Sequence, residues 1–419
     1  MHRYLLRLAL LPVASLVSAC GDAPQETVAV EFLPVSAATG SAEPHLSLTV
    51  WGEAVLSWLE PDGDGVALRV STLGEDAWQE PVTVASGDNW FVNWADFPSV
   101  VPISDTLWAA HWLARRPGGV YSYDVAIAVS GDAGQSWGQP VTPHDDGTAT
   151  EHGFVTLFAW DESVGAIWLD GRNMAASDVN EGHGKAGADA HGSGMTLRSA
   201  IIGTDGSIRK PQLVDELVCD CCQTDVAIAA NGPVAVYRNR TIDEIRDIHV
   251  ISARGGTWQI DTAVADDGWK IAACPVNGPA ISARENNVAV AWFTAAGDDT
   301  QVQMAWSSDA GESFGAPIDI DVGRPIGRVD VELLEDDVAV VSWLRMGDND
   351  EGEICLRQVN ASGNRGPVRI IATTGANRMS GFPQMVRQRD GLILAWTDTR
   401  DPESRVVSAR VDSASLKIR

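Results

Sequence analysis

Seven copies of one short pattern run through this chain, and they constrain its fold more than any other feature. Each copy is an apolar run of strand length, rich in β-branched residues, that ends in an aromatic residue and is bounded by turn formers. The aromatic residues recur about 51 to 69 residues apart and are Trp58, Trp112, Trp168, Tyr237, Trp292, Trp343 and Trp396. A repeat of this length indicates one supersecondary unit used many times, not a single deep core.

Each repeat contains further strands at constant places around the apolar run. A shorter apolar stretch comes about ten residues earlier, an alternating strand about ten residues later, and a short strand after a proline often ends the repeat. Helical spacing of apolar residues is nearly absent. Four strands per repeat are typical of a propeller blade. The sequence therefore predicts an all-β fold, a β-propeller of four-stranded blades, with seven blades, or six if one repeat is an embellishment.

The two ends of the repeat region predict how the ring closes. The last repeat stops after its third strand, near residues 406–410, and the segment 32–37 before the first repeat looks like an orphaned fourth strand. An N-terminal strand that completes the last blade would leave no unpaired edge in the ring.

The N-terminus has the layout of an export signal. A basic start is followed by an apolar run over residues 5–17 and by small residues before Cys20. The run is too short to span a bilayer, and the small residues resemble a bacterial lipobox, in which the cysteine is lipidated. The alternative is a plain secretory signal with a chance cysteine. We expect a lipoprotein signal peptide at 1–19, a tether at 20–30 and a single β-propeller domain at 31–419, in an exported, membrane-anchored protein of the periplasm or cell surface.

The charge of the chain excludes some partners. The formal net charge is −27 and the pI is near 4.5. Nucleic acid and anionic membrane surfaces are therefore not expected to bind, and the membrane would be reached only through the lipid anchor. We expect a monomer.

Two turn motifs carry a family resemblance. The segment 130–137 matches the Asp-box pattern S-x-D-x-G-x-x-W, and 307–314 matches it with Phe for Trp. The motif residues are Ser130, Asp132, Gly134, Trp137, Ser307, Asp309, Gly311 and Phe314. In register with a sevenfold repeat, these motifs make the chain similar to the sialidase-like (BNR or Asp-box repeat) β-propellers. The resemblance implies that the motifs are structural and lie on the face opposite the ligand site.

The catalytic residues implied by that resemblance are not recognisable. Sialidases hold a substrate carboxylate with three arginines and use a Tyr–Glu pair and an Asp. The nearest string to their N-terminal F-R-I-P-like motif begins at Phe97 and lacks the arginine, while Tyr237 occupies a core position. The hypotheses are a module that binds a glycan or other anionic ligand on the face opposite the Asp-boxes, an exo-alpha-sialidase-type glycoside hydrolase, and a protein that handles copper or thiols.

Charged residues recur on the face predicted to bind. Guanidinium groups suit planar anions, and carboxylates are the groups that a glycoside hydrolase needs. The candidate ligand-binding residues are Arg172, Arg238, Arg240, Arg328, Arg345 and Arg400. The candidate catalytic residues are Asp96, Asp170, Asp225, Asp330 and Asp398. The alternative role is salt bridging between blades, with Asp170 or Asp398 holding a neighbouring arginine.

Four cysteines lie in the segments that lead into the fourth and fifth repeats: Cys219, Cys221, Cys222 and Cys274. Outside the cytoplasm they would form one or two disulfides. Alternatively, with His152 nearby, they would bind copper or zinc, or act as a redox pair. The spacing matches no common zinc module, and we expect adjacent Cys221 and Cys222 not both to turn inward. Cys355, alone in a strand, is expected to be a buried thiol.

Overall fold

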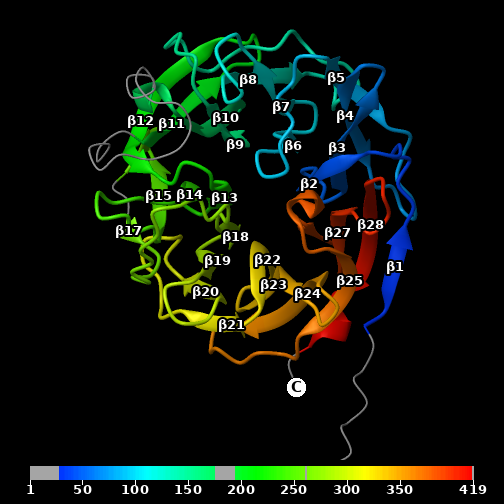
Figure 1. The fold of residues 1–419 in the computed structure, drawn as a ribbon, viewed down its shortest axis with the longest axis vertical. Helices are drawn as coiled ribbons and strands as arrows, with labels where there is room; N and C mark the ends of the chain where they lie inside the picture. The colour runs from blue at the N-terminus through cyan, green and yellow to red at the C-terminus, as the bar shows by residue number, and fades with distance from the viewer. Residues whose placement is uncertain (1–27, 175–193, 260–261, 418–419) are drawn as a thin grey trace, which may run out of the picture.

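The computed structural model describes residues 28–174, 194–259 and 262–417. The predicted signal peptide, Cys20 and most of the tether lie outside these residues. Within them, the strands form seven antiparallel sheets arranged in a ring (Figure 1). The prediction of a seven-bladed, all-β propeller is therefore confirmed.

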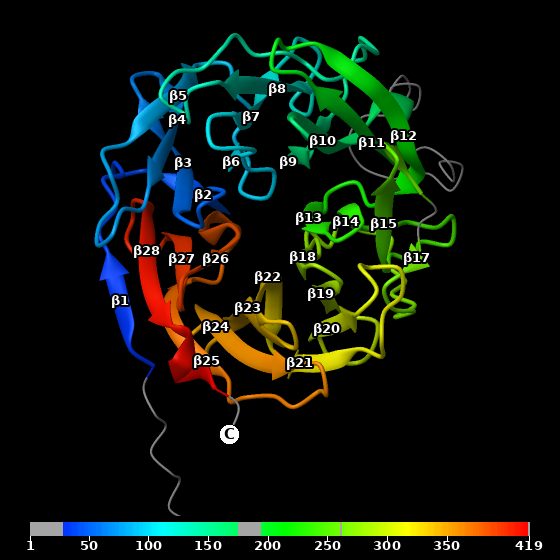
Figure 2. The ribbon, with the colours of Figure 1, turned by 180° about the vertical axis from the view of Figure 1, so that it is seen from behind.

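Each blade runs from an inner strand at the ring axis to an outer strand at the rim, as both views of the ribbon show (Figures 1 and 2). Blade 1 contains β2 (Ala42–Leu48), β3 (Ala54–Asp62), β4 (Gly65–Thr72) and β5 (Val82–Gly87). Blade 2 contains β6 (Ser99–Pro102), β7 (Trp108–Arg115) and β8 (Tyr123–Ser130). Blade 3 contains β9 (His152–Trp160), β10 (Ser163–Asp170), β11 (Met195–Ile202) and β12 (Ile208–Val218). Blade 4 contains β13 (Asp225–Ala229), β14 (Gly232–Arg238), β15 (Ile248–Arg254), β16 (Thr257–Trp258) and β17 (Thr262–Ala263).

The remaining blades follow the same order. Blade 5 contains β18 (Ala280–Arg284), β19 (Asn287–Thr294), β20 (Gln301–Ser307) and β21 (Ile318–Val322). Blade 6 contains β22 (Pro325–Glu335), β23 (Val338–Met346), β24 (Glu351–Asn360) and β25 (Arg369–Gly375). Blade 7 contains β26 (Gln384–Gln388), β27 (Gly391–Asp398), β28 (Arg405–Asp412) and β1 (Val30–Leu33). Short 3-10 turns are η1 (Arg172–Met174), η2 (Arg378–Ser380) and η3 (Ser413–Leu416).

The ring closes as the sequence predicts. Strand β1 pairs antiparallel with β28, with Val30 opposite Val411 and Leu33 opposite Ser408. The N-terminal strand is thus the outer strand of blade 7, and the first and last repeats are joined by main-chain hydrogen bonds. This pairing removes the free edge that β28 would otherwise expose.

The repeated aromatic residues form the contacts between neighbouring blades. Each aromatic at the second strand of a blade packs into a cluster with residues of the preceding blade; Trp343 of blade 6, for example, meets Phe293 and Met304 of blade 5. The same holds for Trp58 against blade 7 and for Tyr237 against blade 3. Rings of this size bury roughly 150–250 Å² each. The sequence period therefore becomes a ring of apolar seams between blades.

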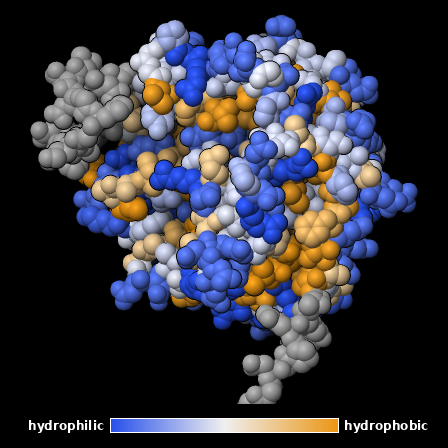
Figure 3. All heavy atoms as spheres, turned by 45° about the vertical axis from the view of Figure 1, so that its right-hand side comes forward, coloured by the Kyte–Doolittle hydropathy of each residue, from blue (hydrophilic) through white to orange (hydrophobic). Residues whose placement is uncertain are grey.

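The outer surface is mainly polar. Figure 3 shows hydrophilic side chains over most of one side of the molecule, with apolar patches among them. Among the described residues, the structure contains no helix with the length and apolar character needed to cross a membrane.

Candidate functional site

Strand order assigns the loops to two faces. In every blade the first strand starts at one face of the ring and the antiparallel second strand returns to it. The segment that leads into the first strand and the loop between the second and third strands therefore lie on the same face. We call this the lead-in face. The opposite face carries the turns that join first to second and third to fourth strands; the turns at residues 49–53 and 133–135 line one surface hollow there.

A central cavity of about 210 Å³ lies on the axis of the ring, and all seven inner strands line it. Aromatic rings face it from the lead-in segments of blades 2 and 7 and from β9: Phe97, Phe382 and Phe154. Phe97 and Phe382 contact one another with ring centroids 5.8 Å apart, and Phe382 stacks on Trp94. Apolar ring faces and polar groups therefore meet at the mouth of the cavity.

Three of the five candidate catalytic carboxyls, Asp96, Asp225 and Asp330, line this cavity. Each accepts a main-chain hydrogen bond from the inner strand of the next blade. The donors are Phe154 N–H to Asp96 (2.6 Å), Ile281 N–H to Asp225 (2.9 Å) and Met385 N–H to Asp330 (2.7 Å). These carboxyls therefore connect blades 2 to 3, 4 to 5 and 6 to 7 around the axis.

Burial sets the ionisation of the cavity carboxyls. It raises the pKa of Asp96 to about 7 and that of Asp225 to about 6. Burial, with Glu332 and Asp225 close by, also raises the pKa of Asp330 well above its usual range. Carboxyl groups with raised pKa values keep their protons to a higher pH than exposed carboxyls do, and a protonated carboxyl can donate as well as accept hydrogen bonds.

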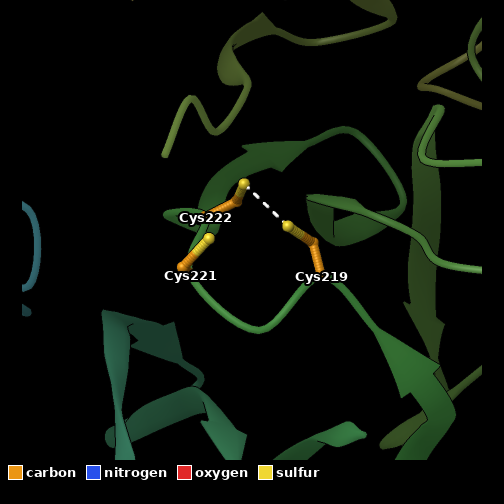
Figure 4. Close-up of side chains that lie close together, drawn as sticks. All are labelled: Cys219, Cys221 and Cys222. Carbon is orange, nitrogen blue, oxygen red and sulfur yellow. Dashed lines mark hydrogen bonds between the residues drawn. The ribbon is translucent and has the colours of Figure 1, made fainter. Parts of the chain in front are cut away.

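The cysteines of the fourth repeat form a second cluster on the lead-in face. The turn between β12 and β13 holds Cys219, Cys221 and Cys222, whose sulfur atoms all lie within 4.8 Å of one another. The Sγ atoms of Cys219 and Cys222 are 2.9 Å apart. Figure 4 shows the three side chains turned toward a common point. The expectation that adjacent Cys221 and Cys222 cannot both turn inward is wrong, because the chain curves through this turn.

Two arginines give the cysteine cluster a positive surrounding. Arg246 Nη1 lies 3.4 Å from Cys219 Sγ. Burial opposes ionisation of Cys219, but hydrogen bonds from Cys221 and Cys222 and the charges of Arg246 and Arg238 lower the pKa of its thiol well below the usual value. Burial raises the pKa of Cys222. Within this cluster the pKa of the Cys219 thiol is thus lowered and that of the Cys222 thiol is raised.

The other two cysteines differ in position. Cys274 is exposed, and its hydrogen bond with Cys221 lowers the pKa of its thiol. Cys355 is fully buried in β24, away from this cluster, as expected. The fourth and fifth repeats therefore do bring their cysteines together.

His152 does not join the cysteines, contrary to expectation. Its Nδ1 faces the carbonyl of Tyr123 at 3.2 Å and its Nε2 faces Asp146 at 3.1 Å, so the ring is held against residues of blade 2. It stacks on His144 with ring centroids 3.8 Å apart, and burial lowers the pKa of His144 to about 4. Asp124 and Asp170 complete this buried cluster.

All six candidate ligand-binding arginines are engaged with the protein itself. The partners are Asp170 and Asp146 for Arg172; the carbonyls of Asn277, Arg246 and Phe293 for Arg238; Asp220 and Glu244 for Arg240; Ser380 and the carbonyls of Gly381 and Asn377 for Arg328; Glu353 for Arg345; and Asp398 for Arg400. The remaining candidate carboxyls, Asp170 and Asp398, are thus arginine partners outside the cavity lining. This pairing favours the structural role that the sequence left open.

Sequence reasoning missed two sets of residues. Arg246 follows the arginine pair of blade 4 by a few positions, but nothing in its local pattern indicates a contact with sulfur. His144, Asp124 and Asp146 lie in loops and strand ends of blade 2 and carry no motif. A histidine and acidic residues within one blade interval were the only signal that could have pointed to them.

Comparisons with known proteins bear on the fold. No protein-family profile matches the chain, and no curated protein matches it either. Among solved structures, a protein of unknown function from Dyadobacter fermentans DSM 18053 is 14% identical, with a TM-score of 0.52 over 91% of this chain and 98% of that chain. The endosialidase of phage phi92 is 10% identical, with a TM-score of 0.51 over 92% and 69%.

A Trypanosoma rangeli sialidase in complex with sialic acid is 13% identical, with a TM-score of 0.48 over 87% of this chain and 60% of that chain. At these identities the likeness extends to the fold alone. The chain has a sialidase-like β-propeller fold.

Proposed function

We propose that this protein is an exported, lipid-anchored propeller that binds the end of a glycan in the central cavity, at the lead-in face. The observation that carries the proposal is the lining of the cavity: buried Asp96 and half-buried Asp225 and Asp330, beside the rings of Phe97, Phe154 and Phe382. Carboxyl groups exchange hydrogen bonds with sugar hydroxyls, and ring faces cover the apolar faces of sugars. The cavity volume of about 210 Å³ is below the roughly 300–1,000 Å³ of pockets for drug-sized ligands, so we propose that it takes one sugar unit.

The pairing of the arginines refines the class of ligand. Every candidate arginine already has a protein partner, while the cavity is lined by acidic groups. An anionic ligand would have to displace a paired carboxylate or enter a cavity whose described lining contains no lysine or arginine. We therefore propose a neutral, polyhydroxylated glycan end in preference to an anionic one.

A printed array carrying neutral and sialylated glycans tests this proposal with the fluorescently labelled mature domain. We expect neutral glycans to be bound, and Phe97→Ala, which removes a ring at the mouth of the cavity, to weaken that binding by roughly tenfold or more. Trp51→Ala, on the opposite face, is the matched control and should bind as the wild type does. Retention of sialylated glycans in preference to neutral ones, or equal binding by Phe97→Ala, would contradict the proposal.

One observation favours an exo-alpha-sialidase-type hydrolase as a second candidate. Tyr123 donates its hydroxyl hydrogen bond to Asp96 at 3.2 Å, and Glu151 lies beside them, with its pKa raised to about 8 by burial and by Asp96. These are the residue types that a sialidase uses. Tyr123 is only 1% exposed, however, so it cannot reach a substrate without movement of the loops. Hydrolysis of a fluorogenic sialoside by the mature domain, lost in Glu151→Gln, would favour this candidate.

Export and anchoring form a separate part of the proposal, supported by the layout of residues 1–20. Labelled palmitate should be incorporated into the wild type and not into Cys20→Ser. Cell fractionation should find the wild type with membranes and Cys20→Ser in the soluble exported fraction. Labelling of the Cys20→Ser chain would show that the anchor is elsewhere.

A further inference from the structure

The turn between β12 and β13 has an arrangement that a disulfide alone does not require. Three sulfur atoms from four consecutive residues, Cys219 to Cys222, face one point, with every pair within 4.8 Å (Figure 4). A disulfide uses two of them and leaves the third turned inward without a covalent partner. Thiolates bound to one metal ion at about 2.3 Å lie about 4 Å apart. The Cys219 and Cys222 sulfurs, at 2.9 Å, are closer together than this, so one of them has to move outward for all three sulfurs to share one metal ion.

The type of metal follows from the ligands. Thiolates are soft ligands and select Cu⁺ and, where four ligands are present, Zn²⁺. The turn supplies three sulfurs, and the fourth cysteine of the region, Cys274, is exposed beside Cys221. Three sulfurs suit a three-coordinate Cu⁺ ion, which has no need of a fourth protein ligand.

The surroundings compensate the charge of such a site. Three thiolates and one Cu⁺ carry a net charge of −2, which is costly to bury without a counter-charge. Arg246 lies 3.4 Å from Cys219 Sγ and is itself held by Glu244 at 2.8 Å. Arg238, only 1% exposed, adds a second positive charge nearby. Guanidinium groups placed in this way orient and stabilise a thiolate centre.

The burial of the sulfurs defines an inner and an outer side. Cys219 and Cys222 are 1% and 2% exposed, while Cys221 is half-buried and Cys274 is exposed. The main chain fixes the turn, because the Cys219 N–H donates to the Arg238 carbonyl at 3.0 Å. An ion could thus reach the site from the side of Cys221 and Cys274 and be shielded from water on the other.

We propose that Cys219, Cys221 and Cys222 bind one Cu⁺ ion as a three-coordinate thiolate site on the lead-in face, with Cys274 as the outer sulfur through which the ion enters and leaves. The three sulfurs bind as thiolates, any proton that they still carry is released to solvent as the three Cu–S bonds form, and the copper does not change its oxidation state. The site is separate from the cavity proposed to bind a glycan.

Competition for Cu⁺ tests the proposal with the mature protein, reduced and kept under nitrogen. The protein is titrated with Cu⁺ against bathocuproine disulfonate, and the bound metal is counted by elemental analysis. We expect one Cu⁺ per chain and thiolate-to-copper charge-transfer absorption in the ultraviolet. Cys222→Ser should weaken binding by roughly 100-fold, and half-buried Cys221→Ser, which should not disturb folding, by a similar factor.

Control variants distinguish this copper site from a zinc site and from a disulfide. Cys355→Ala removes a cysteine outside the cluster and should bind Cu⁺ as the wild type does. Glycan binding should be unchanged in Cys221→Ser, so the two proposals fail independently. The proposal is overturned if the reduced protein binds no Cu⁺, if Cys221→Ser binds it unchanged, or if Zn²⁺ is bound in preference with Cys274 required. A Cys219–Cys222 disulfide that persists in the protein treated with reductant would also overturn it.

Discussion

At the residue scale, burial affects the pKa values of the carboxyl groups that line the cavity more than neighbouring charges do. Asp96 is buried and Asp225 is half-buried, both accept hydrogen bonds from main-chain N–H groups, and burial raises their pKa values. Asp398 is instead held by Arg400, chiefly through a side-chain hydrogen bond, and its pKa is lowered. The same residue type thus keeps its proton to a higher pH at the axis of the ring than at its surface.

The raised pKa of Asp96 predicts a pH-dependent stability. An unfolded Asp titrates near 3.9, and the folded value is about 7. The folded state therefore holds an additional proton between these values. The contribution of this proton to the stability of the folded state is complete below a pH of about 4 and is lost as the pH rises through about 7.

Asp96→Asn removes this titration. Urea unfolding from pH of about 4 to about 8 should show the free energy of unfolding of the variant rising relative to the wild type, by at most about 1.4 kcal/mol per pH unit. The exposed Asp105→Asn serves as control and should keep the wild-type pH dependence. Parallel curves for Asp96→Asn and wild type would show that Asp96 is ionised in the folded protein at neutral pH.

Arg238 provides a second prediction at this scale. Its guanidinium donates to three main-chain carbonyls, and the guanidinium carbon Cζ lies 4.9 Å from the centre of the Trp269 ring. Arg238→Met leaves these carbonyls without donors in a buried site, so we expect a loss of roughly 3 kcal/mol or more in the free energy of unfolding. Arg324→Met, at an exposed ion pair with Asp348, should cost less than about 1 kcal/mol. Equal losses in denaturant titrations would refute the structural role of Arg238.

At the element scale, the two turns that carry the Asp-box pattern have the same local geometry. Ser130 Oγ accepts from Gly134 N–H and Ser307 Oγ accepts from Gly311 N–H, each at 2.9 Å. Both glycines have positive φ, 79° and 85°. The turns follow β8 and β20, the third strands of blades 2 and 5, on the face away from the cavity. They hold strand ends and take no part in the proposed sites.

Gly134 gives a test of this turn. A Cβ at this position would lie 2.7 Å from the Trp108 ring, and the positive φ disfavours any other residue. We expect Gly134→Ala to lower the free energy of unfolding by more than about 1 kcal/mol. Gly131→Ala, three residues earlier, places its Cβ in open space and should have little effect. Thermal unfolding of both variants makes the comparison, and an undisturbed Gly134→Ala would show that the turn adapts freely.

At the scale of the whole molecule, the ring depends on one short strand. Strand β1, from the N-terminal part of the chain, pairs with β28, the last strand, and so closes the ring. Its Phe32 contacts Trp396, with the ring centroids 6.1 Å apart. Leu33 is 3% exposed in the seam between blades 7 and 1. The last blade is therefore completed by residues that are far from it in sequence.

Truncation tests how much the pairing of β1 with β28 stabilises the ring. Removal of residues 1–34 should lower the Tm by roughly 5–10 °C, because Leu33 is lost from the seam and the edge of β28 is exposed. It should also increase aggregation. Removal of residues 1–27, which keeps β1, is the control and should leave the Tm unchanged. Equal Tm values for the two truncated proteins would mean that the ring is stable when open.

The repeat in the sequence was sufficient to predict the blades, their number and the closing strand. Apolar alternation, turn formers and aromatic spacing act between residues close in the chain, or identically in every repeat, so they can be interpreted without coordinates. The burial of Trp58, Trp168 and Trp396 follows directly from that periodicity.

Only the tertiary structure decided which side chains meet on the lead-in face. Backbone curvature and contacts between segments bring the three sulfurs together in one turn and place Arg246 beside Cys219. They also direct the ring of His152 toward Asp146. The pairing of each arginine is equally a matter of which acceptor lies within reach once the blades are assembled. Local pattern sets which residues lie on a face, whereas close packing between blades sets their partners.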